Sequence, residues 1–208
     1  TNHQISGFVG PYLMQYKYGG WLSTSLINIK PVIKSENLSM DIESSMAYFD
    51  AGKLHLNMKY DNGINIDQSL QYISAKSVLI NVSLYADSEI KSVLQWFGEL
   101  LIDELKYENI AEGFQFSLDN GLLIHTRFSD PKIEFNLSEN GYMSISTDPI
   151  KIWNQPILKQ VILSIFSEED DMDSEIELVQ SVLDDPTTVL INHKNRWERY
   201  DLSISKFS

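Results

Sequence analysis

Three Asn-Gly turns constrain the fold of this chain more than any other feature of its sequence. An acidic residue followed by Asn-Gly occurs at residues 61–63, 119–121 and 139–141, each time between two runs in which apolar and polar residues alternate. Asn-Gly between alternating runs is a leading signal for a β-hairpin, because both residues tolerate a positive φ. The sequence therefore predicts three antiparallel hairpins.

Side-chain parity predicts the length of these hairpin loops. A two-residue loop would place Phe116 opposite His125 and mix apolar with polar side chains on one face. A three-residue loop with glycine in the left-handed region places Phe116 opposite Ile124 instead. The same loop pairs apolar residues in all three hairpins: Met58 with Ile66, Tyr60 with Ile64, Leu118 with Leu122, Phe135 with Ile145, and Leu137 with Met143. Because a half-buried sheet has one apolar face, we expect three-residue loops.

Further alternating runs predict additional strands. They cover residues 26–33, 40–49 and 78–85, and near the C-terminus residues 187–192 and 196–205 around a turn at 193–195. Alternation of this kind is typical of strands with one buried face.

Three other segments have apolar residues at helical spacing. A cap at Asp87 or Ser88 precedes the first, which extends to Leu105. Asn154-Gln155-Pro156 precedes the second, at residues 157–166, with proline near the first turn. The capping box of residues 174–177 begins the third, which Asp184-Asp185-Pro186 ends.

Together these elements predict an α+β fold, mostly an antiparallel sheet built from three-residue-loop hairpins and packed against about three helices. The residues expected to point toward the helices are Phe114, Phe116, Leu118, Ile124, Phe128, Phe135, Leu137 and Ile145. We expect one domain over residues 1–208, with a weak subdivision near 110–113 as the alternative.

Charge and composition exclude several functions. Sixteen Lys and Arg against 29 Asp and Glu give a net charge of −13, so we expect no direct nucleic-acid binding and no binding to an anionic membrane. The absence of cysteine excludes disulfides and thiolate metal sites. The four histidines are too far apart in sequence for a metal-binding pair, and we expect neither a metal nor another cofactor. The first residues show no signal-peptide pattern, which predicts a cytoplasmic location unless a signal has been removed.

The densest charged feature is the acidic run that contains Glu168, Glu169, Asp170, Asp171 and Asp173. Alternating carboxylates resemble Ca²⁺ ligands, but the glycine and glutamate that an EF-hand requires at its sixth and twelfth positions are missing. Two interpretations remain: a solvated connection between helices, or a docking patch for a basic protein.

Two tryptophans and one polar pair are further candidates. Trp153 and Trp197 are either exposed anchors for a protein partner or ordinary packing residues. His125 and Arg127 share a strand face and form either a ligand-binding pair or a partly solvated surface.

These observations predict an acidic protein-binding module of bacterial or phage origin. Its most concrete form is an inhibitor or immunity-type protein that neutralises a basic partner, such as a toxin or a nucleic-acid-processing enzyme. The alternatives are an enzyme whose carboxylates and histidine come from distant strands, and a module that binds a small apolar ligand. The absence of catalytic motifs weighs against an enzyme.

Overall fold

The computed structural model describes residues 12–13, 20–21, 23–33, 41–100, 106–111, 113–118, 121–130, 132–167 and 170–204, and these contain fifteen strands and two helices. Eight strands form the larger sheet, in the spatial order β4 (Ile42–Asp50), β5 (Lys53–Tyr60), β6 (Ile64–Tyr72), β7 (Ser77–Ala86), β15 (Ile157–Phe166), β11 (Leu123–Phe128), β10 (Gly113–Ser117) and β9 (Lys106–Ile110). The five-stranded sheet contains β12 (Ile133–Leu137), β13 (Tyr142–Thr147), β8 (Ile90–Leu100), β14 (Ile150–Ile152) and β3 (Ser23–Ile33), which pairs with β8. A separate pair joins β1 (Tyr12–Leu13) to β2 (Gly20–Trp21).

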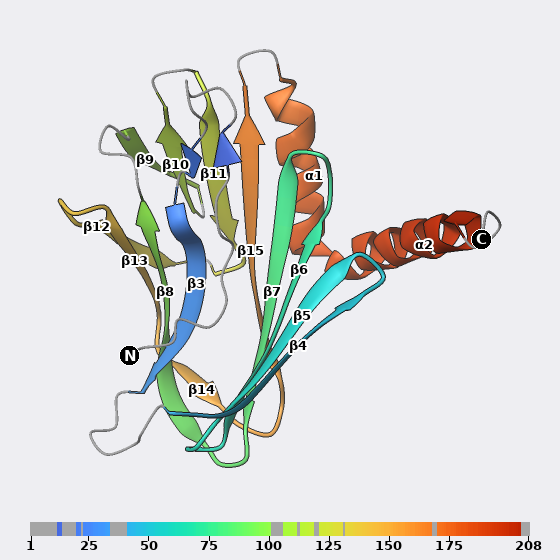
Figure 1. Cartoon of the computed structure of the whole chain (residues 1–208). Coiled ribbons are helices and arrows are strands. Elements are labelled where there is room, and N and C mark those ends of the chain that lie inside the picture. Colours follow the sequence, from blue (N-terminus) through green and yellow to red (C-terminus); the bar gives the residue numbers. More distant parts are fainter. Residues whose placement is uncertain are drawn as a thin grey trace.

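The two large sheets face each other and enclose the main core (Figure 1). Trp96 of the five-stranded sheet meets Phe128 of the eight-stranded sheet edge to face, with ring centroids 5.7 Å apart. The fold is therefore an antiparallel β-sandwich, and the prediction of an α+β fold with about three helices is wrong. The predicted inward set does line the core, with Phe135 and Leu137 at its partly buried margin. Most of these side chains face the opposite sheet, where helices were expected.

The three hairpins have the predicted loops and register. Met58 pairs with Ile66, Phe116 with Ile124 and Phe135 with Ile145. The three loop glycines all have positive φ: Gly63 at 83°, Gly121 at 82° and Gly141 at 77°. The strands expected at 26–33, 40–49 and 78–85 are also present, as β3, β4 and β7.

The first predicted helix, from residue 88 to 105, is wrong. Residues 90–100 form strand β8, and residues 101–105 lie outside the described part of the chain. Leu94 and Trp96 point into the core, while Val93 and Phe97 are the apolar residues of the opposite face. Because β8 is a central strand flanked by β3 on one edge and by β13 and β14 on the other, apolar residues on both faces imitate helical spacing.

The second predicted helix, at residues 157–166, is wrong for the same reason. This segment is β15, a central strand between β7 and β11. Val161 and Leu163 point into the sandwich core, and Ile162 points to the other side beneath a helix. A strand covered on both faces becomes an almost continuous apolar run, which periodicity alone does not distinguish from a buried helix.

The C-terminal region is helical throughout its described part. The third predicted helix exists as α1 (Met172–Asp184), capped by Asp171 ahead of the predicted Ser174. The predicted final hairpin is wrong, because residues 186–204 form α2 (Pro186–Ile204). The Asp185 side chain accepts a hydrogen bond of 3.1 Å from the Thr187 amide. Asp185-Pro186 therefore begins a helix, since proline is favoured at a first helical position.

Helix α1 packs on the outer face of the eight-stranded sheet, the face turned away from the five-stranded sheet. Its Val179 and Val182 bury against Ile73, Leu79 and Ile162 in a second, smaller core. Helix α2 follows and extends past the ends of β4 and β5 (Figure 1). Within the described residues, neither helix has the length and apolarity needed to cross a bilayer. The helices cover only part of the outer face, and the remainder holds the candidate site.

Candidate functional site

Polar side chains of three neighbouring strands converge on the uncovered part of the outer face. His55 and Asn57 of β5 stand opposite Ser69 and Asp67 of β6 in the sheet register. On the next strand, Asn81 and Ser83 of β7 stand opposite the same two β6 residues. Since alternate residues of a strand share a face, the register forms a continuous polar surface across the three strands.

This surface is hollowed into a groove of about 260 Å³, which we call the sheet-face groove. Its lining residues include Lys53, His55, Asn57, Asp67, Ser69, Asn81, Ser83 and Leu158. A second hollow of about 320 Å³, the helix-side chamber, lies beside it and includes Gln71 of β6 and Lys194 of α2. Lys53 and His55 line both hollows. The two hollows are therefore neighbouring parts of one site.

Hydrogen bonds hold the floor of the groove. The Asn57 side chain donates a bond of 2.6 Å from Nδ2 to Oδ1 of Asp67. Gln160 donates a bond of 2.7 Å from Nε2 to Oδ1 of Asn81, and both of these residues are buried. The other end of the Asn57 amide, Oδ1, is buried and has no hydrogen-bond partner among the described residues. A buried acceptor without a partner is uncommon in native proteins and marks a place where a ligand donor could bind.

The electrostatics of the groove favour a neutral imidazole. Burial lowers the pKa of His55, and the nearby Lys53 lowers it further, while Asp50 and Asp67 oppose the shift. Burial also lowers the pKa of Lys53, and Asp50 partly offsets this effect. At neutral pH His55 therefore has one N–H donor and one acceptor nitrogen. The Tyr48 ring stacks on it with centroids 4.6 Å apart and planes 4° from parallel.

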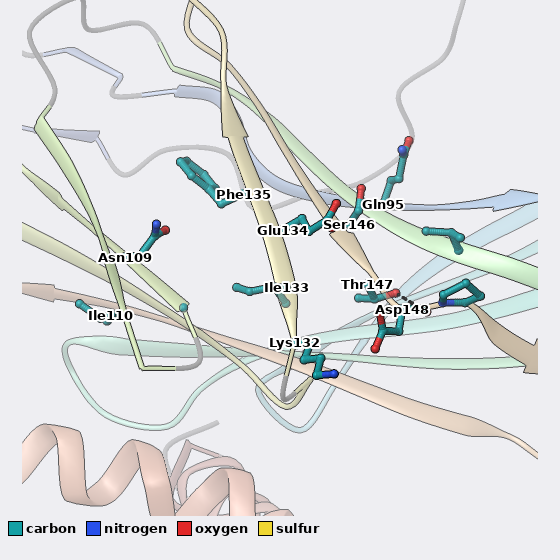
Figure 2. Close-up of a pocket in the computed structure, with 13 residues that line it drawn as sticks. Gln95, Asn109, Ile110, Lys132, Ile133, Glu134, Phe135, Ser146, Thr147 and Asp148 are labelled. Atoms are coloured by element: carbon teal, nitrogen blue, oxygen red, sulfur yellow. Dashed lines mark hydrogen bonds between the residues drawn. The ribbon is translucent and has the colours of Figure 1, made fainter.

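A larger hollow of about 780 Å³ surrounds the edge strand β12. In Figure 2, Phe135 and Asn109 lie on one side of β12, whereas Gln95 and Ser146 lie on the other. Glu134 and Asp148 lie on that second side as well, so most of the polar groups of this hollow share a side. The sheet-face groove is the better candidate, because among the described residues it contains a buried polar atom without a hydrogen-bond partner, Asn57 Oδ1, and the residues that line the larger hollow contain none.

The structure gives the described residues of the acidic run local partners. Glu168 and Glu169 lie outside the described residues. Asp170 forms an ion pair with Lys76 and accepts a 2.6 Å hydrogen bond from the Ser167 amide. Asp171 caps α1 through the Ser174 hydroxyl at 2.7 Å and amide at 3.3 Å, and these bonds lower its pKa. Asp173 lies in the first helical turn. The docking role of this run stays a prediction.

The two tryptophans occupy different environments, and β15 separates Trp153 from the acidic run. Trp153 is 53% exposed in the connection before β15, whereas Asp170 follows the other end of that ten-residue strand. A strand of this length separates its ends by about 33 Å. Trp197 lies on α2, is half-buried, and meets Phe49 edge to face at 6.1 Å. Its packing contact favours a structural role, while the anchoring role of both residues stays a prediction.

His125 and Arg127 lie on the outer face, on β11, beside the region that α1 covers. His125 is buried and its Nε2 bonds to Oε1 of Gln115, whose Nε2 donates to Glu108 at 2.7 Å. Burial lowers the pKa of His125, and the charge of Arg127 lowers it further. Arg127 donates a long bond of 3.5 Å to Gln180 of α1. Neither residue lines the hollows described above, and their ligand-binding role stays a prediction.

Sequence reasoning missed the groove, although its signal is present. His55, Asn57 and Lys59 alternate with apolar residues along one strand. The polar positions 67, 69 and 71 and the positions 81 and 83 follow the same alternation on the next two strands. Only the register of three strands shows that these short polar sets lie side by side.

Comparison with known proteins identifies solved structures with a similar fold but assigns the chain to no family. No protein family matches the chain, and no curated protein matches it. Among solved structures, a protein assigned as a kojibiose phosphorylase from the human microbiome aligns with a TM-score of 0.58 at 10% identity, over 84% of this chain and 28% of that one. The chain thus spans less than a third of the length of that protein, and the likeness shows a shared β fold.

Two further structures align less closely. A protein assigned as an aldose 1-epimerase from Escherichia coli K12 has a TM-score of 0.45 at 10% identity, over 59% of this chain and 68% of that one. A heparan sulfate lyase from Pedobacter heparinus has a TM-score of 0.49 at 11% identity, over 72% of this chain and 25% of that one. By name, all three are carbohydrate-active enzymes. The expectation of an α+β inhibitor or immunity-type protein is corrected: the described residues of this chain are mostly antiparallel strand, and nothing in the comparisons supports an inhibitor.

Proposed function

We propose that this chain binds a saccharide in the sheet-face groove. The observation that carries the proposal is the convergence of neutral and acidic hydrogen-bonding side chains from three strands on one hollow, with Asn57 Oδ1 buried and unpartnered among the described residues. The name of the solved structure with a TM-score of 0.58 agrees with this ligand class.

The chemistry of the groove suits a polyhydroxylated ligand. Each sugar hydroxyl is both a donor and an acceptor, so a binding site needs a mixture of both kinds of group. The groove supplies amides from Asn57 and Asn81, hydroxyls from Ser69 and Ser83, and the carboxylate of Asp67. Neutral His55 adds one donor and one acceptor. A site built for an apolar ligand would instead be lined mainly by hydrophobic side chains.

The charge of the chain further restricts the class of saccharide that it can bind. A net charge of −13 repels a densely charged polyanion at long range. Among the residues that line the groove, the positive charge of Lys53 balances the negative charge of Asp67. The proposal is therefore a saccharide that is neutral or carries few charges. Tyr48, which is 43% exposed and stacked on His55, offers a ring beside the groove for the C–H face of a sugar.

Isothermal titration calorimetry with neutral mono- and disaccharides tests the proposal. The wild-type chain should bind at least one of them, and Asn57→Ala and Asp67→Ala should each weaken that affinity about tenfold, because each leaves a groove partner unpaired. Asn136→Ala is the matched control, because it removes an exposed amide from β12 of the other sheet. Equal affinities in all four proteins would refute the groove as the binding site.

A further inference from the structure

We propose that the helix-side chamber is a subsite for one anionic substituent of the saccharide, specifically a carboxylate. This inference rests on the proposed function and adds the substrate class. The floor of the chamber comes from β4, β5 and β6, and its other wall comes from α2, through Thr187, Ile191 and Lys194. A ligand in the sheet-face groove can reach the chamber past Lys53 and His55, because both residues line both hollows.

The first observation is a buried amide. Gln71 lies on β6 on the outer face and is only 2% exposed. Its Nε2 is buried and has no hydrogen-bond partner among the described residues, although the residue lines the chamber. Two N–H donors on that atom therefore require an acceptor that the described protein groups do not supply. A ligand oxygen in the chamber would supply it.

The second observation is the charge around the chamber. Lys53 and Lys194 bring two positive charges, and Asp50 brings one negative charge. Lys194 has a distant partner in Glu198, at 3.8 Å, and most of its side chain is exposed. Burial lowers the pKa of Lys53, and an anion beside it would raise that pKa again. In a chain of net charge −13, this local balance favours a single negative charge on the ligand.

The donors of the chamber distinguish it from the groove. Gln71 Nε2, the Thr187 hydroxyl and the two lysines can all donate, and His55 contributes one N–H. A carboxylate accepts several such bonds at once and forms stronger bonds with charged donors. A phosphate monoester carries about −1.5 to −2 charges at neutral pH, which is more than the two lysines provide after Asp50 is counted. A carboxylate is therefore the better match.

Helix α2 is held where its residues can complete this subsite. Trp197 lies directly on the turn between β4 and β5, where a Cβ on Gly52 would come 1.7 Å from the indole Nε1. The same ring meets Phe49 of β4 edge to face. This contact lies one turn of helix beyond Lys194 and fixes the wall of the chamber against the sheet.

Matched sugar pairs test the inference. Affinities of D-galactose and D-galacturonate, and of D-glucose and D-glucuronate, are measured by calorimetry on the full chain. The acid of at least one pair should bind about tenfold more tightly than its neutral partner, as one added charged hydrogen bond predicts. That preference should shrink as the Debye length falls from ~10 Å at 0.1 M salt to ~3 Å at 1 M.

Variants assign the preference to the chamber. Lys53→Met and Gln71→Leu should each reduce the acid preference at least severalfold, whereas Lys59→Met on the same face of β5 should leave it unchanged. Lys59 pairs with Glu43 outside the chamber. Circular dichroism melting identifies any variant that fails to fold, and Lys194→Met, on an exposed helix position, gives a second test that does not disturb the sheet.

The outcomes separate the two proposals. Equal affinity for acid and neutral sugars would overturn the carboxylate subsite and leave the saccharide site intact. Binding of no sugar in either pair, and of none of the neutral disaccharides, would overturn both. D-galactose 6-phosphate and D-glucose 6-phosphate are measured in the same way. If either binds more strongly than the matching uronate, and Lys53→Met abolishes that binding, the carboxylate assignment is overturned in favour of phosphate.

Discussion

Asn57 and Asp67 join strands β5 and β6 at the floor of the sheet-face groove, through a hydrogen bond of 2.6 Å from the amide to the carboxylate. The bond holds the carboxylate at a fixed place on the outer face and leaves the amide oxygen as a buried acceptor. A rigid pair of this kind orients a ligand group at little entropic cost at the moment of binding. The same pair also contributes to the stability of the sheet.

A double-mutant cycle should measure that contribution. Asn57→Ala, Asp67→Ala and the double variant are compared by urea denaturation. Because the pair is half-buried, we expect a coupling free energy of about 1 kcal/mol in unfolding. Additive single effects would contradict a native hydrogen bond between these two side chains.

Lys159 and Asp130 form the most buried ion pair described in the sandwich, with side chains 15% and 5% exposed. Asp130 Oδ2 has no further partner among the described residues. Lys159→Met should lower the free energy of unfolding by about 3–5 kcal/mol, because it leaves a buried charge without a partner. Lys159→Met with Asp130→Leu should recover most of the loss, and a double variant no more stable than the single one would contradict this account.

Alanine substitutions at two glycines with positive φ, Gly63 and Gly52, distinguish the cost of backbone strain from the cost of disturbed side-chain packing. Gly63 has φ 83°, and a Cβ there would meet nothing closer than Asp87 Oδ2 at 3.6 Å. Gly63→Ala should therefore cost about 1–2 kcal/mol from the left-handed conformation alone. Gly52→Ala has the same strain and also displaces Trp197. Gly52→Ala should therefore lower the free energy of unfolding, measured by thermal denaturation, more than Gly63→Ala does. Equal losses in the two variants would show that the Trp197 contact does not hold α2.

Burial of His125 predicts a pH dependence of stability. Its pKa in the folded chain lies below the ordinary value of about 6.5, because of burial and the Arg127 charge. Between these two values the unfolded chain binds more protons than the folded chain, so stability falls as the pH drops below about 6.5. His125→Gln should flatten the dependence of unfolding free energy on pH in this range. An unchanged slope would mean that His125 keeps an ordinary pKa in the folded chain.

The fold could be predicted where information is local. The loop glycines and the parity of Phe116 with Ile124 were enough to predict three hairpins with their register. The central strands β8 and β15 could not be recognised, because burial on both faces removes the alternation that marks a strand. The prediction that Asp184-Asp185-Pro186 ends a helix is confirmed, since α1 ends at Asp184, but the sequence did not indicate that Pro186 also begins α2.

The candidate site was predictable only in part. The polar side of β5 with His55 and Asn57 can be identified from alternation alone. Its neighbours Asp67 and Asn81 belong to the same site because of long-range register, which one sequence does not contain. Gln71 becomes informative only when its burial and its unpartnered nitrogen are known.

The most direct test of the saccharide site is a nuclear magnetic resonance titration of the ¹⁵N-labelled chain with the tightest-binding saccharide from calorimetry. The account predicts that the largest amide shifts occur at His55, Asn57, Asp67 and Asn81, with the hollow around β12 unaffected. Largest shifts at Glu134 and Ser146, or no saturable shift on the outer face of the eight-stranded sheet, would contradict it.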